Sequence, residues 1–592
     1  MTELYIDGQP VVLPLNFSME IIQENPFYTK NGTYTYDLTL SLRDEQNAKL
    51  YRHLNRINNQ VDIPLNRSAY MVVDNEVFLK GTEVILEITD NAVKIQLLSG
   101  ESELNYFIGG DRKMNSLDLG SLYGDEGGDY EYIPLYSANE DRVFNEYGLM
   151  QSNDGAIFLT GTAGSGIIAQ PYLYVIINRI LQNLGYSINT NVFENSKLRF
   201  LYLVNGKRTN IINKMLPDWT IGEFFEELEK LFNIAFLIEE QKRTVNIVFK
   251  NTYYESAAKV HVDLVLDSYN QRIDKERKED YSNANIGYDF PDDEYYRYQN
   301  LSKNILDKAE YISLDSFFAI IRYITEFPNK DLLKNKIFIS LESNTQYIMW
   351  EKPDSQVTLD YDYRKVNSLR PIRNNPDNED IDVLLRILPA PMQIREINVL
   401  KQPDHPSSSP ETTVLYKMMA PMPAITTDPY FERDREIGSS PTPDDIIKIQ
   451  DVLENGDTYQ DDDATENIYL AFYTGYHRIL EKVFTKLPRE VDYPIGFIDF
   501  LVDDFGLGEY SIDANNLSLR LDDPYGLKML YEQSKPIDTT REFVCQFTYD
   551  KKIDVKRVFV FNNKEFVCKQ LKYAVTPQGI DRLIEGLFYP MS

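Results

Sequence analysis

The chain has 592 residues and carries 61 Lys and Arg against 92 Asp and Glu, which gives a formal net charge of −31 at pH 7. Because domains usually hold about 100 to 200 residues, this length predicts several cores rather than one. An apolar share of 43% and an aromatic share of 12% exclude a wholly disordered chain, and an acidic chain without a Lys/Arg stripe lacks the features of a nucleic-acid-binding protein.

Residues 1–108 read as an N-terminal domain of short strands resembling a β-barrel. Apolar residues alternate with polar ones on both sides of an Asp7-Gly8 turn, which predicts a hairpin over residues 4–15. An Asn31-Gly32 turn is followed by strict alternation of apolar and polar residues over 34–40, which predicts a strand. A short helix is predicted over 45–58, and three β-rich runs over 77–98 are separated by turns at Lys80-Gly81 and Asp90-Asn91. Many short strands with one longer connection favour a small barrel or sandwich.

Residues 109–166 are rich in Gly, Asp and Tyr and show little periodicity, so we expect an extended, exposed arm. Residues 167–255 predict an α+β insertion domain built from two helix-then-strand units. The first has an apolar stripe from Pro171 to Leu184, and the second opens on a Thr220-x-x-Glu223 capping box and continues into a hairpin over 234–249.

The second half of the chain divides into three further regions. Residues 256–400 form a mixed α/β middle region, with a helical pattern near 314–324 and strand-like pieces at 337–341 and 357–363. Residues 401–466, crowded with Pro, Ser, Thr and Asp, predict an exposed insertion that serves as an interaction loop. Residues 467–592 predict a C-terminal β-rich domain, with antiparallel strands over 542–549, 555–561 and 565–575.

The two ends of the chain share a short pattern. Asp74 to Phe78 and Phe561 to Phe566 each place a polar turn before an aromatic strand, and each is followed by a Thr-bearing turn and a last apolar strand. The fold class expected from all these elements is α+β and β-rich, with related antiparallel β-barrel or sandwich domains at both ends and helix-strand units inserted between them.

No catalytic, cofactor-binding or metal-binding residue is predicted. Cys545 and Cys568 are too few for a disulfide framework or a four-Cys zinc site, and the four His are far apart in sequence. The acidic run 457–466 lacks the spacing of an EF-hand, and the Gly-rich stretch 161–166 lacks the Lys-Ser/Thr ending of a phosphate loop. The triplet Asp504-Phe505-Gly506 resembles a kinase metal-binding motif, but no other kinase motif accompanies it. No signal peptide or membrane span is visible, so we expect a chain made in a reducing cytosol.

Tyr is the most unusual component, with 42 residues and clusters such as 295–298. Exposed Tyr rings either stack on sugars or anchor protein interfaces, and we favour interfaces.

Two strings carry a resemblance to a known family. The opening Tyr5-Ile6-Asp7-Gly8-Gln9 and the run from Glu24-Asn25-Pro26-Phe27-Tyr28 through Leu40, followed by 47–51, resemble the N-terminal region of tail proteins from tailed phages of the Bacteroidales, including crAss-like phages. Residues 219–249 and 566–589 are similar to segments of phage tail-hub proteins, and the resemblance covers about a third of the chain.

The resemblance implies a structural, non-enzymatic virion protein made in the cytoplasm of the bacterial host. It implies a tail hub that forms a homo-oligomeric ring on the tail axis and binds tube, ring, tip or fibre proteins of the tail. It also implies that DNA passes through the negatively charged lumen of the ring during ejection without binding specifically. A head-to-tail adaptor and a tail-tip muzzle subunit stay open within this class. A glycan-binding or glycan-degrading tail protein is the alternative from another class, but no fixed-period β-repeat supports it.

Overall fold

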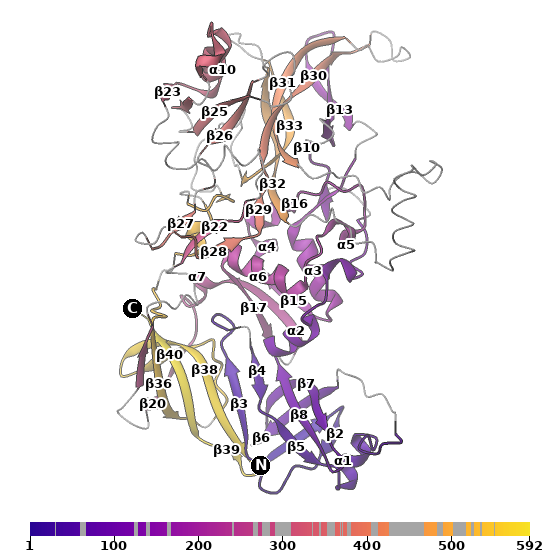
Figure 1. The fold of residues 1–592 in the computed structure, drawn as a ribbon, viewed down its shortest axis with the longest axis vertical. Coiled ribbons are helices and arrows are strands. Elements are labelled where there is room, and N and C mark those ends of the chain that lie inside the picture. Colours follow the sequence, from indigo (N-terminus) through magenta and orange to yellow (C-terminus); the bar gives the residue numbers. More distant parts are fainter. Residues whose placement is uncertain are drawn as a thin grey trace, which may run out of the picture.

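The computed structural model describes residues 1–592 except 30, 60–66, 123–127, 138–141, 163–166, 240–241, 265–269, 275–283, 291–309, 334–335, 342–344, 352–360, 367–368, 370, 376–379, 404–412, 426–466, 482–488, 501–516, 523–525, 533–534, 550 and 592. The body is elongated (Figure 1). One end holds the strands of both chain termini side by side, most of the helices lie in the middle, and the long strands β30 (Met392–Lys401) and β31 (Val414–Ile425) occupy the other end.

The strands of the two termini form one 16-stranded sheet rather than two separate domains. Its central pairing joins β3 to β38 in antiparallel register, from Met19 opposite Val575 to Glu24 opposite Gln570. The members are β1 (Thr2–Ile6), β2 (Gln9–Val11), β3 (Met19–Glu24), β4 (Thr33–Thr35), β5 (Leu38–Ser41), β6 (Ser68–Val73), β7 (Glu76–Ile88), β8 (Ala92–Ser99), β19 (Lys259–His261), β20 (Asp263–Leu264), β21 (Asn270–Ile273), β36 (Arg541–Thr548), β37 (Val558–Phe561), β38 (Lys564–Thr576), β39 (Gly579–Ile580) and β40 (Leu583–Pro590).

A ten-stranded sheet forms the opposite end of the body. Its members are β10 (Leu135–Ser137), β11 (Arg142–Phe144), β12 (Tyr147–Gln151), β13 (Ile157–Thr162), β16 (Leu201–Leu203), β29 (Ile387–Pro389), β30 (Met392–Lys401), β31 (Val414–Ile425), β32 (Ile468–Glu481) and β33 (Glu490–Phe497). Segments far apart in sequence thus meet in this sheet, as β10 and β31 do in parallel.

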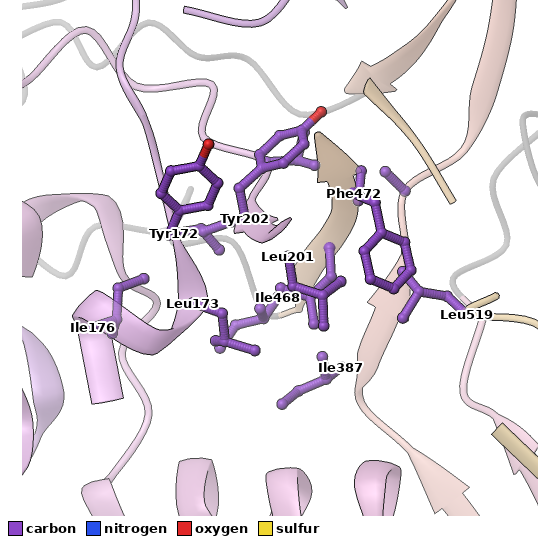
Figure 2. Close-up of a cluster of buried hydrophobic side chains, with 14 of the residues drawn as sticks. Tyr172, Leu173, Ile176, Leu201, Tyr202, Ile387, Ile468, Phe472 and Leu519 are labelled. Carbon is purple, nitrogen blue, oxygen red and sulfur yellow. The ribbon is translucent and has the colours of Figure 1, made fainter. Parts of the chain in front are cut away.

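Between the two large sheets lies the α+β unit expected from the sequence. Helices α3 (Leu173–Asn183) and α6 (Ile221–Phe232) pack on the three-stranded sheet of β15 (Ser187–Asn191), β17 (Ile234–Glu239) and β18 (Thr244–Phe249). The capping box at Thr220 and Glu223 is present with both of its hydrogen bonds, so α6 begins where the sequence predicts. The central core connects this unit to the ten-stranded sheet, and Figure 2 shows the part lined by Leu173, Ile176, Leu201, Ile387, Ile468 and Phe472.

Smaller elements complete the chain. The helices are α1 (Glu45–Leu50), α2 (Glu101–Ile108), α4 (Val192–Asn195), α5 (Ile212–Met215), α7 (Lys250–Tyr253) and α10 (Phe317–Glu326). The remaining strands are β9 (Tyr130–Glu131), β14 (Gln170–Pro171), β22 (Asn285–Tyr288), β23 (Tyr311–Leu314), β24 (Ile337–Ser340), β25 (Thr345–Glu351), β26 (Tyr361–Val366), β27 (Ile372–Arg373), β28 (Val383–Leu385), β34 (Asp499–Phe500) and β35 (Leu517–Ser518).

The fold class is therefore confirmed as β-rich α+β, but four regional expectations need correction. The segment 109–166 is not an exposed arm in its described residues, since Leu117, Leu122 and Ile133 are buried in the central core. Its strands are short, and β10 to β13 pair in the ten-stranded sheet with strands remote in sequence, so the segment has no long periodic pattern. The insertion 401–466 contains the long strand β31, whose residues 418–425 are all buried.

The third correction concerns residues 467–592, because β32 and β33 pair in the ten-stranded sheet and not with the C-terminal strands. The fourth lies in the N-terminal region. The helix expected over 45–58 ends at Leu50, because Arg52 and His53 adopt left-handed backbone angles. The turn expected at Lys80-Gly81 is absent, since β7 runs through Gly81.

Gly81 has a different role from the expected turn. A Cβ at this position would lie 1.9 Å from the carbonyl oxygen of Leu98 on the neighbouring strand β8. The glycine therefore permits a close approach of two backbones within the sheet.

Candidate functional site: the junction groove

The candidate functional site lies where the N-terminal strands, the C-terminal strands and the α+β unit meet. Its central residue, Asn25, follows β3 and is fully buried. The Asn25 side-chain amide donates to the carbonyl of Cys568 at 2.6 Å, to the Tyr254 hydroxyl at 2.9 Å and to the carbonyl of Val555 at 3.3 Å. Its oxygen accepts from the backbone N–H of Phe27 at 3.2 Å. One side chain thus connects three parts of the chain that are remote in sequence.

Aromatic rings pack around this asparagine. Phe27 lies 4.6 Å from Tyr253 and 5.3 Å from Tyr254 between ring centroids, and Tyr28 contacts Tyr589 edge-on at 5.1 Å. They belong to a separate hydrophobic cluster that also includes Ala235, Leu237, Ile537, Val558 and Val567. The string that carries the family resemblance, residues 24–28, is therefore an internal joint of the molecule.

Two acids at the start of α2 hold the α+β unit against the N-terminal strands. A carboxylate oxygen of Glu101 accepts a hydrogen bond from the backbone N–H of Ile238 in β17 at 3.0 Å. The buried carboxylate of Glu103 accepts from the Thr82 hydroxyl at 2.5 Å and pairs with the Arg243 guanidinium at 2.7 Å. Because the Glu103 side chain is only 2% exposed, removing the arginine would leave a buried charge unpaired.

A groove of about 820 Å³ opens at this junction. One wall is the face of the α+β sheet turned away from its helices, with Leu237, Asn246 and Val248. The other walls are the end of β3 and the loop that connects β36 to β37, residues 549–557. Its position among three units means that anything bound there would contact all three.

The charge of the groove differs from that of the whole chain. Five cations border it, namely Lys242, Lys551, Lys552, Lys556 and Arg557, against the four acids Glu24, Glu101, Glu239 and Asp554. The chain as a whole carries a net charge of −31. The groove therefore lacks the acidic excess of the whole chain, and its positive charge is concentrated on the 551–557 side.

A buried ion pair fixes the core of the N-terminal strands. The Arg67 guanidinium lies 2.8 Å from a carboxylate oxygen of Glu83, with side chains 5% and 1% exposed. The same arginine stacks over the Tyr51 ring, whose hydroxyl donates to Glu83. Burial raises the pKa of Glu83 above its ordinary value, and burial also raises the pKa of Tyr51.

Both cysteines of the chain are buried. Burial raises the pKa of the Cys545 thiol to about 11, and it raises that of the fully buried Cys568 thiol as well, so neither has the character of a nucleophile. Among the residues that the structure describes, no three His, Cys, Asp or Glu side chains are grouped as metal ligands. No helix within the described ranges is long and apolar enough to cross a membrane.

Several sequence features that we weighed lie outside the described residues. They are the acidic run 457–466, the triplet at 504–506, the Tyr cluster 295–298 and most of the Gly-rich stretch 161–166. Sequence reasoning missed the groove itself, because its walls come from segments separated by hundreds of residues. The dense cations of 551–557 were the one local signal that pointed to it.

No model of a known protein family matches the chain, and no curated protein sequence matches it. Among solved structures, it is similar to the 43 kDa tail protein of prophage MuSo2 from Shewanella oneidensis, with 7% identity and a TM-score of 0.31 over 99% of this chain and 96% of that one. It is also similar to a tail protein from Neisseria meningitidis MC58, with 5% identity and a TM-score of 0.25 over 99% and 95% of the two chains. At such identities and scores, neither likeness establishes a shared fold or function.

Proposed function

We propose that this chain is a structural subunit of a phage tail, and specifically a tail hub that forms a ring on the tail axis. The sequence resemblance in residues 5–9 and 24–40 first points to this class. The observation that carries the proposal is the architecture of the terminal sheet, in which one chain contributes two similar sets of strands joined through β3 and β38.

The similarity of the two sets is visible strand by strand. In the first, β6 turns at Asp74 and Asn75 into the 13-residue β7, which pairs with the eight-residue β8. In the second, β37 turns at Asn562 and Asn563 into the 13-residue β38, which pairs with the eight-residue β40. All four turn residues have positive φ angles between 51° and 70°. This agreement supports the short repeat that the sequence shows at the two ends of the chain.

Such a duplication suits a ring that must match a six-fold tail tube. A closed ring of three copies would present six related strand sets, so a three-fold subunit arrangement could contact a six-fold partner. The net charge of −31 is consistent with a lumen that repels the phosphate backbone and lets DNA pass without binding. The proposal places the chain in the virion tail, in contact with other tail proteins, and assigns it no catalytic step.

The purified protein tests this proposal by mass-resolved light scattering together with negative-stain images. A closed ring of three subunits with a central hole is the expected result. A ring of twelve would instead favour a head-to-tail adaptor. Single subunits at every protein concentration, with no ring in the images, would contradict the hub assignment.

A further inference from the structure

The loop between β36 and β37 concentrates positive charge to an unusual degree for this chain. Residues 551–557 read Lys-Lys-Ile-Asp-Val-Lys-Arg, so four of seven positions are cations in a chain with 61 cations against 92 acids. The loop borders the junction groove along one wall. Its charge therefore lies beside a concave surface rather than on an isolated bulge.

The loop is held firmly by its apolar residues and by its own polar groups. Ile553 and Val555 are 3% and 2% exposed, and the backbone N–H of Ile553 donates to the Tyr573 hydroxyl at 3.1 Å. The Lys552 ammonium donates to the carbonyl of Phe78 in β7 at 2.7 Å. The backbone of the loop is thus anchored at its buried residues, which lowers the conformational entropy that the loop would lose on binding a partner.

The four cations differ in whether their side chains have partners within the described residues. Lys556 pairs with Asp554 at 3.4 Å, and the Lys552 ammonium contacts β7. Lys551 and Arg557 are exposed, and in the described part of the chain neither side chain forms an ion pair or a hydrogen bond, although the backbone N–H of Arg557 donates to the carbonyl of Asp554 at 3.2 Å. These two side chains are therefore available to an acidic group from outside.

We propose that the junction groove, with Lys551 and Arg557 at its rim, is the surface on which a second copy of this chain docks through an acidic segment. The inference rests on the proposed ring. A ring built head-to-tail needs two different complementary surfaces on each subunit. Two copies with a net charge of −31 each repel one another at long range, so one of the two contacting surfaces must supply positive charge.

The groove offers both apolar and charged contacts to a peptide segment. The half-buried Val248 and Tyr253 line it and can contact apolar side chains, and the cations at its rim can pair with carboxylates. The two exposed cations lie outside the packed joint around Asn25, so changing them leaves the fold of the subunit intact.

The test is a double charge reversal with a matched control. The test variant carries Lys551→Glu and Arg557→Glu, and the control carries Lys214→Glu and Lys564→Glu, two lysines that are also exposed. Each reversal subtracts two charges, so both variants change the net charge from −31 to −35. Oligomeric mass is measured against protein concentration at low and at high salt, with thermal unfolding as the check on folding.

We expect the wild type and the control to assemble alike, and the dissociation constant of the test variant to rise at least about tenfold. We also expect added salt to narrow the difference between the test variant and the control, which share a net charge of −35, because screening weakens the local attraction at the groove. Equal assembly of all three proteins would overturn this inference and leave the ring proposal intact. If the wild type itself stays as single subunits, the ring proposal fails and this inference fails with it.

A second measurement separates a protein partner from nucleic acid. Binding of a fluorescent DNA duplex to the wild type and the test variant is followed by anisotropy. No binding to either protein agrees with the inference. Binding that the test variant loses while its assembly persists would overturn the inference in favour of a nucleic-acid site.

Discussion

Replacing Asn25 with alanine tests the junction most sharply. The substitution removes an amide that donates to the carbonyl of Cys568, the hydroxyl of Tyr254 and the carbonyl of Val555, and it removes the acceptor of the Phe27 N–H. None of these groups can turn to water, because the site is fully buried.

The expected cost follows from the number of groups left without a partner. A buried donor or acceptor that loses its partner costs about 1 to 3 kcal/mol. At least two groups, the Cys568 carbonyl and the Phe27 N–H, depend closely on Asn25. We therefore expect Asn25→Ala to reduce the local free energy of opening at the β3–β38 pairing by about 3 kcal/mol. Tyr254→Phe removes a single acceptor and is expected to cost about 1 kcal/mol.

Hydrogen exchange of the backbone amides in β3 and β38 is the appropriate assay, because a chain of several sheets does not unfold in one step. A loss of about 3 kcal/mol predicts exchange about a hundredfold faster at these amides. The control is Asn115→Ala, an exposed asparagine whose amide donates to Asp218 at 3.0 Å, with an expected effect within about 0.5 kcal/mol. Unchanged exchange at β3 and β38 in Asn25→Ala would refute the view that this side chain joins the two termini.

Three further predictions concern the terminal sheet. Gly81→Val places a Cβ against the carbonyl oxygen of Leu98 on β8, so we expect a loss of local stability of about 3 kcal/mol, measured by hydrogen exchange of the β7 and β8 amides against Gly110→Ala, where nothing lies within 4 Å of the added Cβ. Burial raises the pKa of Glu83 above its ordinary 4.5, so the stability that this group contributes is present below pH 4.5 and is lost as the pH rises through the folded-state pKa. Glu83→Gln should therefore flatten this part of the curve of unfolding free energy against pH. Cys545 and Cys568 should resist a thiol reagent at pH 8 in the native protein and react after unfolding in urea, and rapid labelling of the native protein would contradict their burial.

Local signals predicted the local elements well. The Asp7-Gly8 and Asn562-Asn563 turns lie where the sequence places them, since positive φ angles favour Gly and Asn. The apolar stripes that follow Pro171 and Thr220 predicted α3 and α6, because an amphipathic face and a capping box are patterns of residues close together in sequence.

Long-range pairing could not be predicted in the same way. Strand β31 is a clear case, because the Pro, Ser, Thr and Asp content of residues 401–466 suggested an exposed loop, and the strand itself contains Pro421 and Pro423. They are two residues apart, so their missing N–H groups point toward the same edge of the strand, and the strand still pairs with β30 over its length.

The candidate site depends on the same kind of long-range pairing. Asn25 contacts residues more than 200 and more than 500 positions away. No local pattern contains that information.

Assembly of three copies into a ring is tested by the mass of the purified protein in light scattering, with negative-stain images of the same sample. We expect a mass of three subunits and particles with a central hole. Single subunits at every concentration, without rings in the images, would contradict it.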